Sequence, residues 1–200
     1  ILATPLKRGQ IILSYFVSAA FSSVILTGII LAVGLVTICM HGNIYLGTID
    51  ILKGFGVVAL GSISTTSIFM IVVLFLKSVS ASGAFFCLLS AVSGFIIGAY
   101  ILISQFSEAI QTVCNIFPAS QITIVLRNVL INGLLEHMNT TLDGVDQGMF
   151  VTSIKELFSF KARLFDGYFD MSQMLVYIVV SIVICIVVQI LVYSKTYKKA

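Results

Sequence analysis

Few residues of this 200-residue chain have side chains suited to acid–base or metal chemistry, and those few are scattered. The two histidines, His41 and His137, lie far apart, and the four cysteines form no CxxC pair and no cluster with His at metal-ligand spacing. A nucleophile with a neighbouring base, or a catalytic metal, needs such groups close together. The sequence therefore predicts no metal site, no cofactor and no catalytic site, and we expect a protein that is not an enzyme.

The glycine spacing that comes nearest to a phosphate-binding loop also fails. A Walker A loop places Lys and then Ser or Thr directly after its last glycine. Gly56 and Gly61 have the required separation, but Ser62 and Ile63 follow them inside an apolar segment. We do not expect this chain to bind ATP through such a loop.

The composition points to the lipid bilayer as the solvent. Hydrophobic residues make up 59% of the chain and charged residues 10%, whereas soluble domains are about 45–50% apolar and about 25% charged. The net charge is only +3 and no basic run is present, so we expect a membrane partner and no nucleic-acid partner.

Four segments are long and apolar enough to cross a membrane, which takes about 20 residues. They are 11–40, 54–76, 84–106 and 173–194. We expect all four to be helices, because a backbone in lipid must satisfy its own hydrogen bonds. None of them contains Asp, Glu, Lys, Arg or His, which argues against an ion-coupled transporter.

The charges predict the orientation. If the N-terminus is inside, the short inner stretches carry six basic residues and no acid, while the long outer stretches carry all eight acids. Basic residues close to span ends favour the cytoplasmic side. We therefore expect a multi-pass protein of the cell membrane with both termini in the cytoplasm.

The outer stretch between the third and fourth segments is expected to fold in two parts. In 107–132, two short helices broken near 115–118, with Pro118 in a first helical turn, would form a hairpin that dips into the outer leaflet. We expect Arg127 to lie near the headgroups or to pair with Glu108. The hairpin would either gate the outer mouth of a path or act as a passive plug.

The second part is the outer loop 133–172. Ser153 and Glu156 have the spacing of a capping box, and Gly167 suits a helix end. These signals predict a helix over 153–166, which would either lie on the membrane surface or form a solvated cap.

Small and hydroxylated residues mark two of the segments. Ser90, Gly94 and Gly98 recur every four residues, which permits close approach of another helix, within the chain or across a dimer. The hydroxyl-rich run 62–67 would either face a polar path or bond back to its own helix carbonyls.

Two stretches resemble the membrane subunits of type-two ATP-binding-cassette exporters. Residues 2–11 (LATPLKRGQI) resemble the cytoplasmic coupling helix of that family, and 115–120 (NIFPAS) followed by Leu126 and Arg127 resemble its outer re-entrant hairpin. The order also fits, because a coupling helix precedes three spans, the outer hairpin, a last span and a basic tail.

The resemblance implies an all-α membrane protein with four transmembrane helices, a coupling helix at 1–10 and a re-entrant helical hairpin, all within one permease domain. It implies a path through the membrane, an ATPase subunit as partner and a second permease copy or homologue. The residues expected to contact the ATPase are Thr4, Pro5, Leu6, Lys7 and Arg8.

The chain departs from the family pattern at its start and in its outer loop. Two further spans and a surface helix are expected upstream of Ile1, which predicts a truncated chain, and 133–172 is longer than in many members. Two other classes stay open, namely half of a secondary transporter and a non-transporting membrane assembly or immunity protein.

Overall fold

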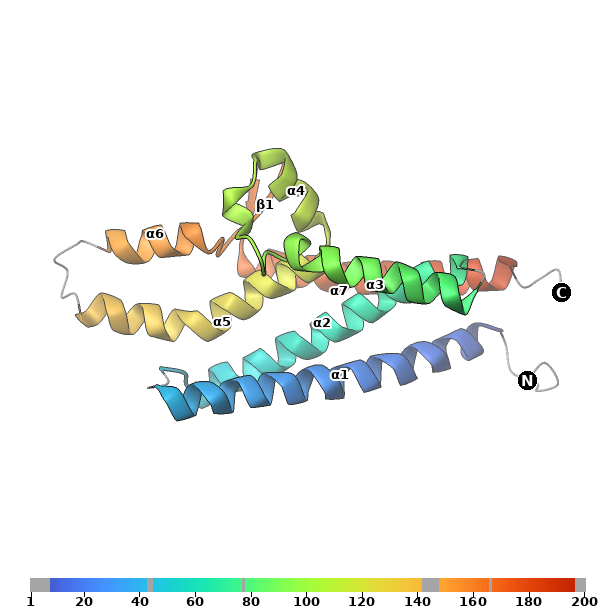
Figure 1. Ribbon diagram of the computed structural model, residues 1–200, viewed down its shortest axis with the longest axis horizontal. Coiled ribbons are helices and arrows are strands. Elements are labelled where there is room, and N and C mark those ends of the chain that lie inside the picture. The colour runs from blue at the N-terminus through green and yellow to red at the C-terminus, as the bar shows by residue number, and fades with distance from the viewer. Residues whose placement is uncertain (1–7, 43–44, 77, 142–147, 166, 197–200) are drawn as a thin grey trace.

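The computed structural model describes residues 8–42, 45–76, 78–141, 148–165 and 167–196. Within these residues the chain forms seven α-helices, one short 3-10 helix and one two-stranded sheet (Figure 1). Four helices are long and apolar enough to cross a membrane. They are α1 (Arg8–His41), α2 (Thr48–Phe75), α3 (Val79–Ile96) and α7 (Met171–Thr196). The protein is thus a largely helical membrane protein, as the hydrophobic segments predicted.

The long helices lie roughly side by side, with α1 and α2 antiparallel (Figure 1). Helix α2 packs against α1, against α5 (Pro118–Thr141) and against α7. At the start of α1, Ile12, Phe16 and Ala20 are buried at intervals of four residues. An ideal Cβ on Gly9 would lie 3.5 Å from Ile190 of α7. The start of α1 and the end of α7 therefore lie at the same end of the molecule.

Helix α3 ends earlier than the sequence predicted. Its last residue is Ile96, not a residue near 106, because Gly98 adopts a left-handed conformation with φ of +72°. The amides of Ala99 and Gly98 donate to the carbonyls of Gly94 and Phe95, which is the Schellman pattern that ends helices. The short helix η1 (Ile103–Gln105) follows.

Gly94 and Gly98 consequently form part of the hydrogen-bonded turn that ends α3. A Cβ on Gly94 would collide with the ring of Tyr100, so the Tyr100 ring occupies the space beside Gly94 that another helix would need. Ser90 is exposed. The prediction of a close helix approach along Ser90, Gly94 and Gly98 within the chain is therefore wrong for the described residues, and the alternative of an approach across a dimer stays a prediction.

A lobe projects sideways from the long helices (Figure 1). We use the name lobe for α4 (Glu108–Ile116) together with the antiparallel strands β1 (Ala162–Leu164) and β2 (Gly167–Phe169). Helix α4 packs against β1. Ala162 and Leu164 are buried and Arg163 between them is not, which is the two-residue alternation of a strand.

The predicted helix over 153–166 is wrong. The helix found there, α6 (Met149–Leu157), begins earlier, and Ser153 lies inside it with its Oγ donating to Met149 O instead of capping a terminus. Positive φ values at Ser159 and Phe165 turn the chain into the strand pair. Gly167 pairs with Leu164 across the tight turn and does not end a helix.

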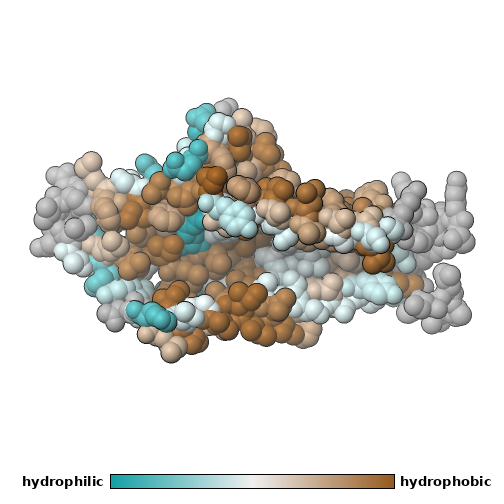
Figure 2. All heavy atoms as spheres, viewed as in Figure 1, coloured by the Kyte–Doolittle hydropathy of each residue, from teal (hydrophilic) through white to brown (hydrophobic). Residues whose placement is uncertain are grey.

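The core lies where α2, α5, α7 and β1 meet. Its buried apolar residues are Val57, Ile122, Ile124, Val125, Val129, Ala162, Met174 and Ile178. Most of the remaining apolar side chains of the four long helices face outward. Figure 2 shows hydrophobic residues covering these helices, with hydrophilic residues on the lobe, as expected when lipid covers the spans.

Candidate functional site

The helix break between α4 and α5 is the most distinctive feature of the described chain. The two helices meet at Phe117 and are bent by 95° relative to each other. Phe117 has an extended backbone, with φ of −75° and ψ of 122°, which is the conformation preferred before proline. Pro118 is the first residue of α5, where its missing N–H costs no helix bond. The break lies where the sequence predicted it.

A buried polar network surrounds the break. Asn115 is 1% exposed, and its Nδ2 donates to Arg163 O at 3.0 Å while its Oδ1 accepts from Ser120 Oγ at 2.8 Å. Gln121 Nε2 donates to Asn115 O at 2.7 Å. The network ties α4, the first turn of α5 and strand β1 together, and it supplies partners to backbone groups near the break.

The last span is joined to the same break. Tyr177 of α7 donates its hydroxyl hydrogen to Ile116 O at 2.8 Å. Ile116 is the last residue of α4, whose C-terminal carbonyls lack partners within the helix. A movement of α7 along its axis would therefore act directly on the break.

Arg127 does not pair with Glu108. Its guanidinium donates to Phe158 O and, at 3.4 Å, to Gly98 O, and it lies 5.8 Å from the centre of the Phe158 ring. Arg127 thereby joins α5 to the turn after α3 and to the end of α6. Burial lowers the pKa of the guanidinium from its ordinary value.

The partner of Glu108 is Arg163 of β1, with their charged atoms 2.8 Å apart. Because α4 is sharply bent away from α5, the first turn of α4 lies against the strand pair and not beside Arg127. Glu108 also sits in the first turn of α4, where the helix dipole favours a negative charge.

The residues expected to contact an ATPase are not placed by the structure. Thr4, Pro5, Leu6 and Lys7 lie outside the described residues, and Arg8 is the first residue of α1. The coupling helix therefore stays a prediction.

Two hydroxyl groups of the run 62–67 of α2 bond back to their own helix, whereas the buried Ser64 Oγ has no hydrogen-bond partner among the described residues. Ser62 Oγ donates to Val58 O at 2.9 Å, and Ser67 Oγ donates to Ser64 O at 2.6 Å. For these two residues, the expectation of bonds back to the helix's own carbonyls is confirmed.

A second interhelical contact was missed by sequence reasoning. Gln189 of α7 is 2% exposed, and its Nε2 donates to Ser67 O of α2 at 2.6 Å. A single amide in the C-terminal part of an otherwise apolar span is the signal that was available.

The described residues contain no group of three or more His, Cys, Asp or Glu side chains close enough to hold a metal ion. Comparison with known proteins gives no match to a family model, to a curated protein or to a solved structure. The candidate site is the helix break between α4 and α5, which is hydrogen-bonded to strand β1 through Asn115 and to helix α7 through Tyr177.

Proposed function

We propose that this chain is the permease unit of an ATP-driven exporter and that a separate ATP-binding-cassette subunit powers it. The observation that carries the proposal is the helix break at Phe117, which lies between the third and last spans and is held by a buried polar network. Irregular backbone at membrane depth persists only against protein or water. The resemblance of 2–11 and 115–127 to type-two exporter subunits supports the same reading, as does the lack of ionisable groups in the span interiors.

The packing offers a route for coupling. Arg8 begins α1, so a push on the coupling segment acts on α1 directly. Helix α1 packs on α7 near Gly9 and Ile190, and α7 bonds to the break through Tyr177. ATPase closure at the cytoplasmic end would then move the break through two packed helices, in the manner of other helix-shift transitions.

Replacing Arg8 with Glu tests the docking step. A planar guanidinium can bind a carboxylate through two hydrogen bonds, and loss of a buried charge contact costs about 2–5 kcal/mol. We expect Arg8→Glu to insert normally but to recover much less of the ATPase subunit on purification and to lose ATP-driven export.

The matched control is Lys195→Glu, which reverses a basic charge at the other described end of the chain. It should leave recovery of the ATPase subunit unchanged. Full export and an intact complex in Arg8→Glu would contradict docking through this segment. A genome with no ATP-binding-cassette subunit for this chain to bind would contradict the exporter itself.

A further inference from the structure

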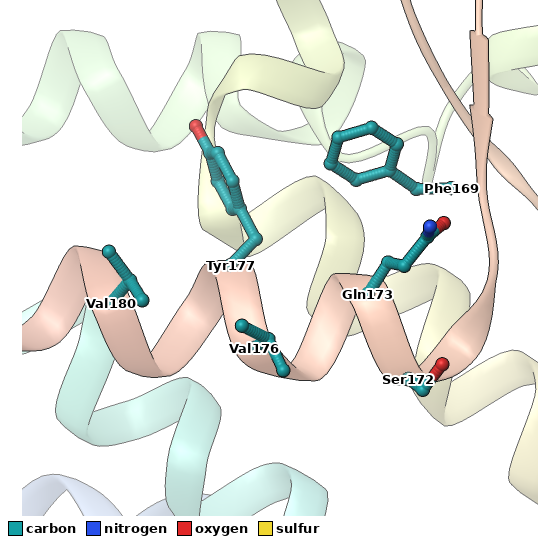
Figure 3. Close-up of a pocket in the computed structure, with 6 residues that line it drawn as sticks. All are labelled: Phe169, Ser172, Gln173, Val176, Tyr177 and Val180. Carbon is teal, nitrogen blue, oxygen red and sulfur yellow. The ribbon is translucent and has the colours of Figure 1, made fainter.

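The N-terminal end of α7 carries an open groove under the lobe. Its cavity of about 410 Å³ is lined almost wholly by apolar atoms. The lining residues are Phe169, Ser172, Gln173, Val176, Tyr177 and Val180 (Figure 3).

Two aromatic side chains form the walls of the groove, and both are fixed. Figure 3 shows Phe169 of β2 and Tyr177 of α7 above the same side of α7, and their rings meet edge-on with centres 6.5 Å apart. The Tyr177 hydroxyl is held by Ile116 O, and the Phe169 side chain packs against the buried core while its backbone pairs with Ala162 in the sheet. The groove is therefore preformed and does not depend on a ligand to open it.

The floor of the groove continues into the exposed face of the span. Val176, Val180, Val183 and Val187 follow one another at intervals of four, three and four residues and so share one helix face. Each is between 49% and 63% exposed. Because α7 crosses the membrane, this face contacts acyl chains, and the groove opens directly onto them.

The residues around the groove change from apolar to charged along α7, from the middle of the helix toward its N-terminal end. Val180 and Val176 lie toward the middle of the span, while Ser172 and then the ion pair of Asp170 with Lys161 lie beyond its end. The ion pair measures 3.2 Å and both side chains are well exposed. A phospholipid has the same order, with an acyl chain followed by a phosphate that an ammonium group attracts.

We infer that this groove binds one acyl chain of a phospholipid from the leaflet at the N-terminal end of α7, with the phosphate near Lys161. That leaflet is the outer one in the orientation predicted from the charges. Because Tyr177 forms a wall of the groove and also bonds Ile116 O, the bound chain lies against the side chain that holds the helix break. The inference depends on the membrane location of the chain and not on the exporter function.

Photolabelling tests the position. The purified protein is reconstituted in phosphatidylcholine vesicles that contain a trace of phosphatidylcholine with a diazirine on its acyl chain, and labelled peptides are mapped by mass spectrometry. We expect labelling of 169–180 to be several-fold above that of the exposed face of α1 around Val36. Equal labelling of the two regions would overturn the inference.

A groove-filling variant with a matched control tests the site. Val176→Trp places a large ring in the groove, and Val187→Trp places the same ring on the same face beyond it. Native mass spectrometry in detergent should detect one retained phosphatidylcholine in the wild type and in Val187→Trp, and none in Val176→Trp. Retention in Val176→Trp equal to that of the control, or no retained lipid in the wild type, would overturn the inference.

Discussion

Buried amide side chains carry the specific contacts of this apolar chain. Asn115, Gln121 and Gln189 are each at most 2% exposed, and each donates to a main-chain carbonyl of another element or turn. Burying an amide N–H without a partner is costly, so the donor contacts of these residues favour this arrangement, although Gln121 Oε1 is buried with no hydrogen-bond partner among the described residues. The break at Phe117 is positioned by such bonds, since apolar contacts alone have little direction.

Asn115→Ala should destabilise the protein. The change removes the bonds to Arg163 O and from Ser120 Oγ and leaves buried polar groups without partners, which costs about 1–3 kcal/mol for each group. We expect a clear fall in the midpoint of thermal unfolding in detergent micelles.

The matched control is Asn132→Ala. Asn132 Nδ2 donates to Glu136 Oε1 one turn further along α5 in a solvent-exposed bond, and changes to surface bonds usually stay within about 0.5 kcal/mol. Equal midpoints for the two variants would show that the Asn115 network does not hold the break.

At the scale of elements, α2 and α5 approach closely at one glycine. A Cβ on Gly61 would lie 2.8 Å from Ile122 Cγ2, whereas a Cβ on Gly56 would meet nothing within 4 Å. Gly61 is thus needed for helix packing. Helix packing thus explains why a glycine stands at position 61, the second glycine of the pair whose spacing resembled that of a phosphate-binding loop.

Gly61→Ala should therefore be destabilising, by about 1–3 kcal/mol for an overpacked contact. Gly56→Ala on the same helix should be neutral or stabilising by up to about 1 kcal/mol, because Ala is the better helix former. Thermal unfolding midpoints measure both changes. In an Ile122→Ala background the cost of Gly61→Ala should largely vanish, and a cost that persisted there would place the clash elsewhere.

Pro118→Ala tests what sets the break. Proline disfavours a helical conformation at Phe117 and supplies no N–H, so alanine permits a straighter connection. Spin labels at Glu108→Cys and Leu134→Cys should move apart in Pro118→Ala, and export should fall more than expression. An unchanged distance would show that the polar network fixes the bend without the proline. Unchanged export would count against a gating role.

The sequence predicted the elements that depend on local signals. The apolar lengths identified the four spans, and Pro118 identified the break. The end of α3 was missed because the left-handed Gly98 that ends the helix lies inside an apolar run that continues to residue 103 without a charge. The strand pair was missed because three-residue strands leave almost no periodic pattern. The start of α6 was misplaced because Ser153 and Glu156 have the spacing of a capping box although both lie inside the helix. The predicted ion pair of Glu108 with Arg127 was wrong because Glu108 pairs with Arg163, a residue far from it in the sequence.

At the scale of the whole molecule, the packing agrees with the distribution of charge. Tyr45, in the link between α1 and α2, stacks on His137 of α5 with ring centres 3.9 Å apart. The link and the C-terminal end of α5 therefore lie at the same end of the molecule (Figure 1). The start of α1 and the end of α7 lie at the other end (Figure 1). The charges had assigned these same pairs of segments to common sides of the membrane.

Cysteine accessibility determines which end faces outward. The background replaces the native residues Cys39, Cys87, Cys114 and Cys185. Single cysteines are then introduced at the predicted outer positions Asn43, Thr141 and Lys161 and at the predicted inner positions Lys77 and Lys199. A membrane-impermeant maleimide added to intact cells should label the first set only, because the inner stretches carry basic residues and no acids. The second set should react after permeabilisation. Labelling of position 77 from outside would reverse the orientation, and with it the leaflet that supplies the groove on α7 and the side on which an ATPase must bind.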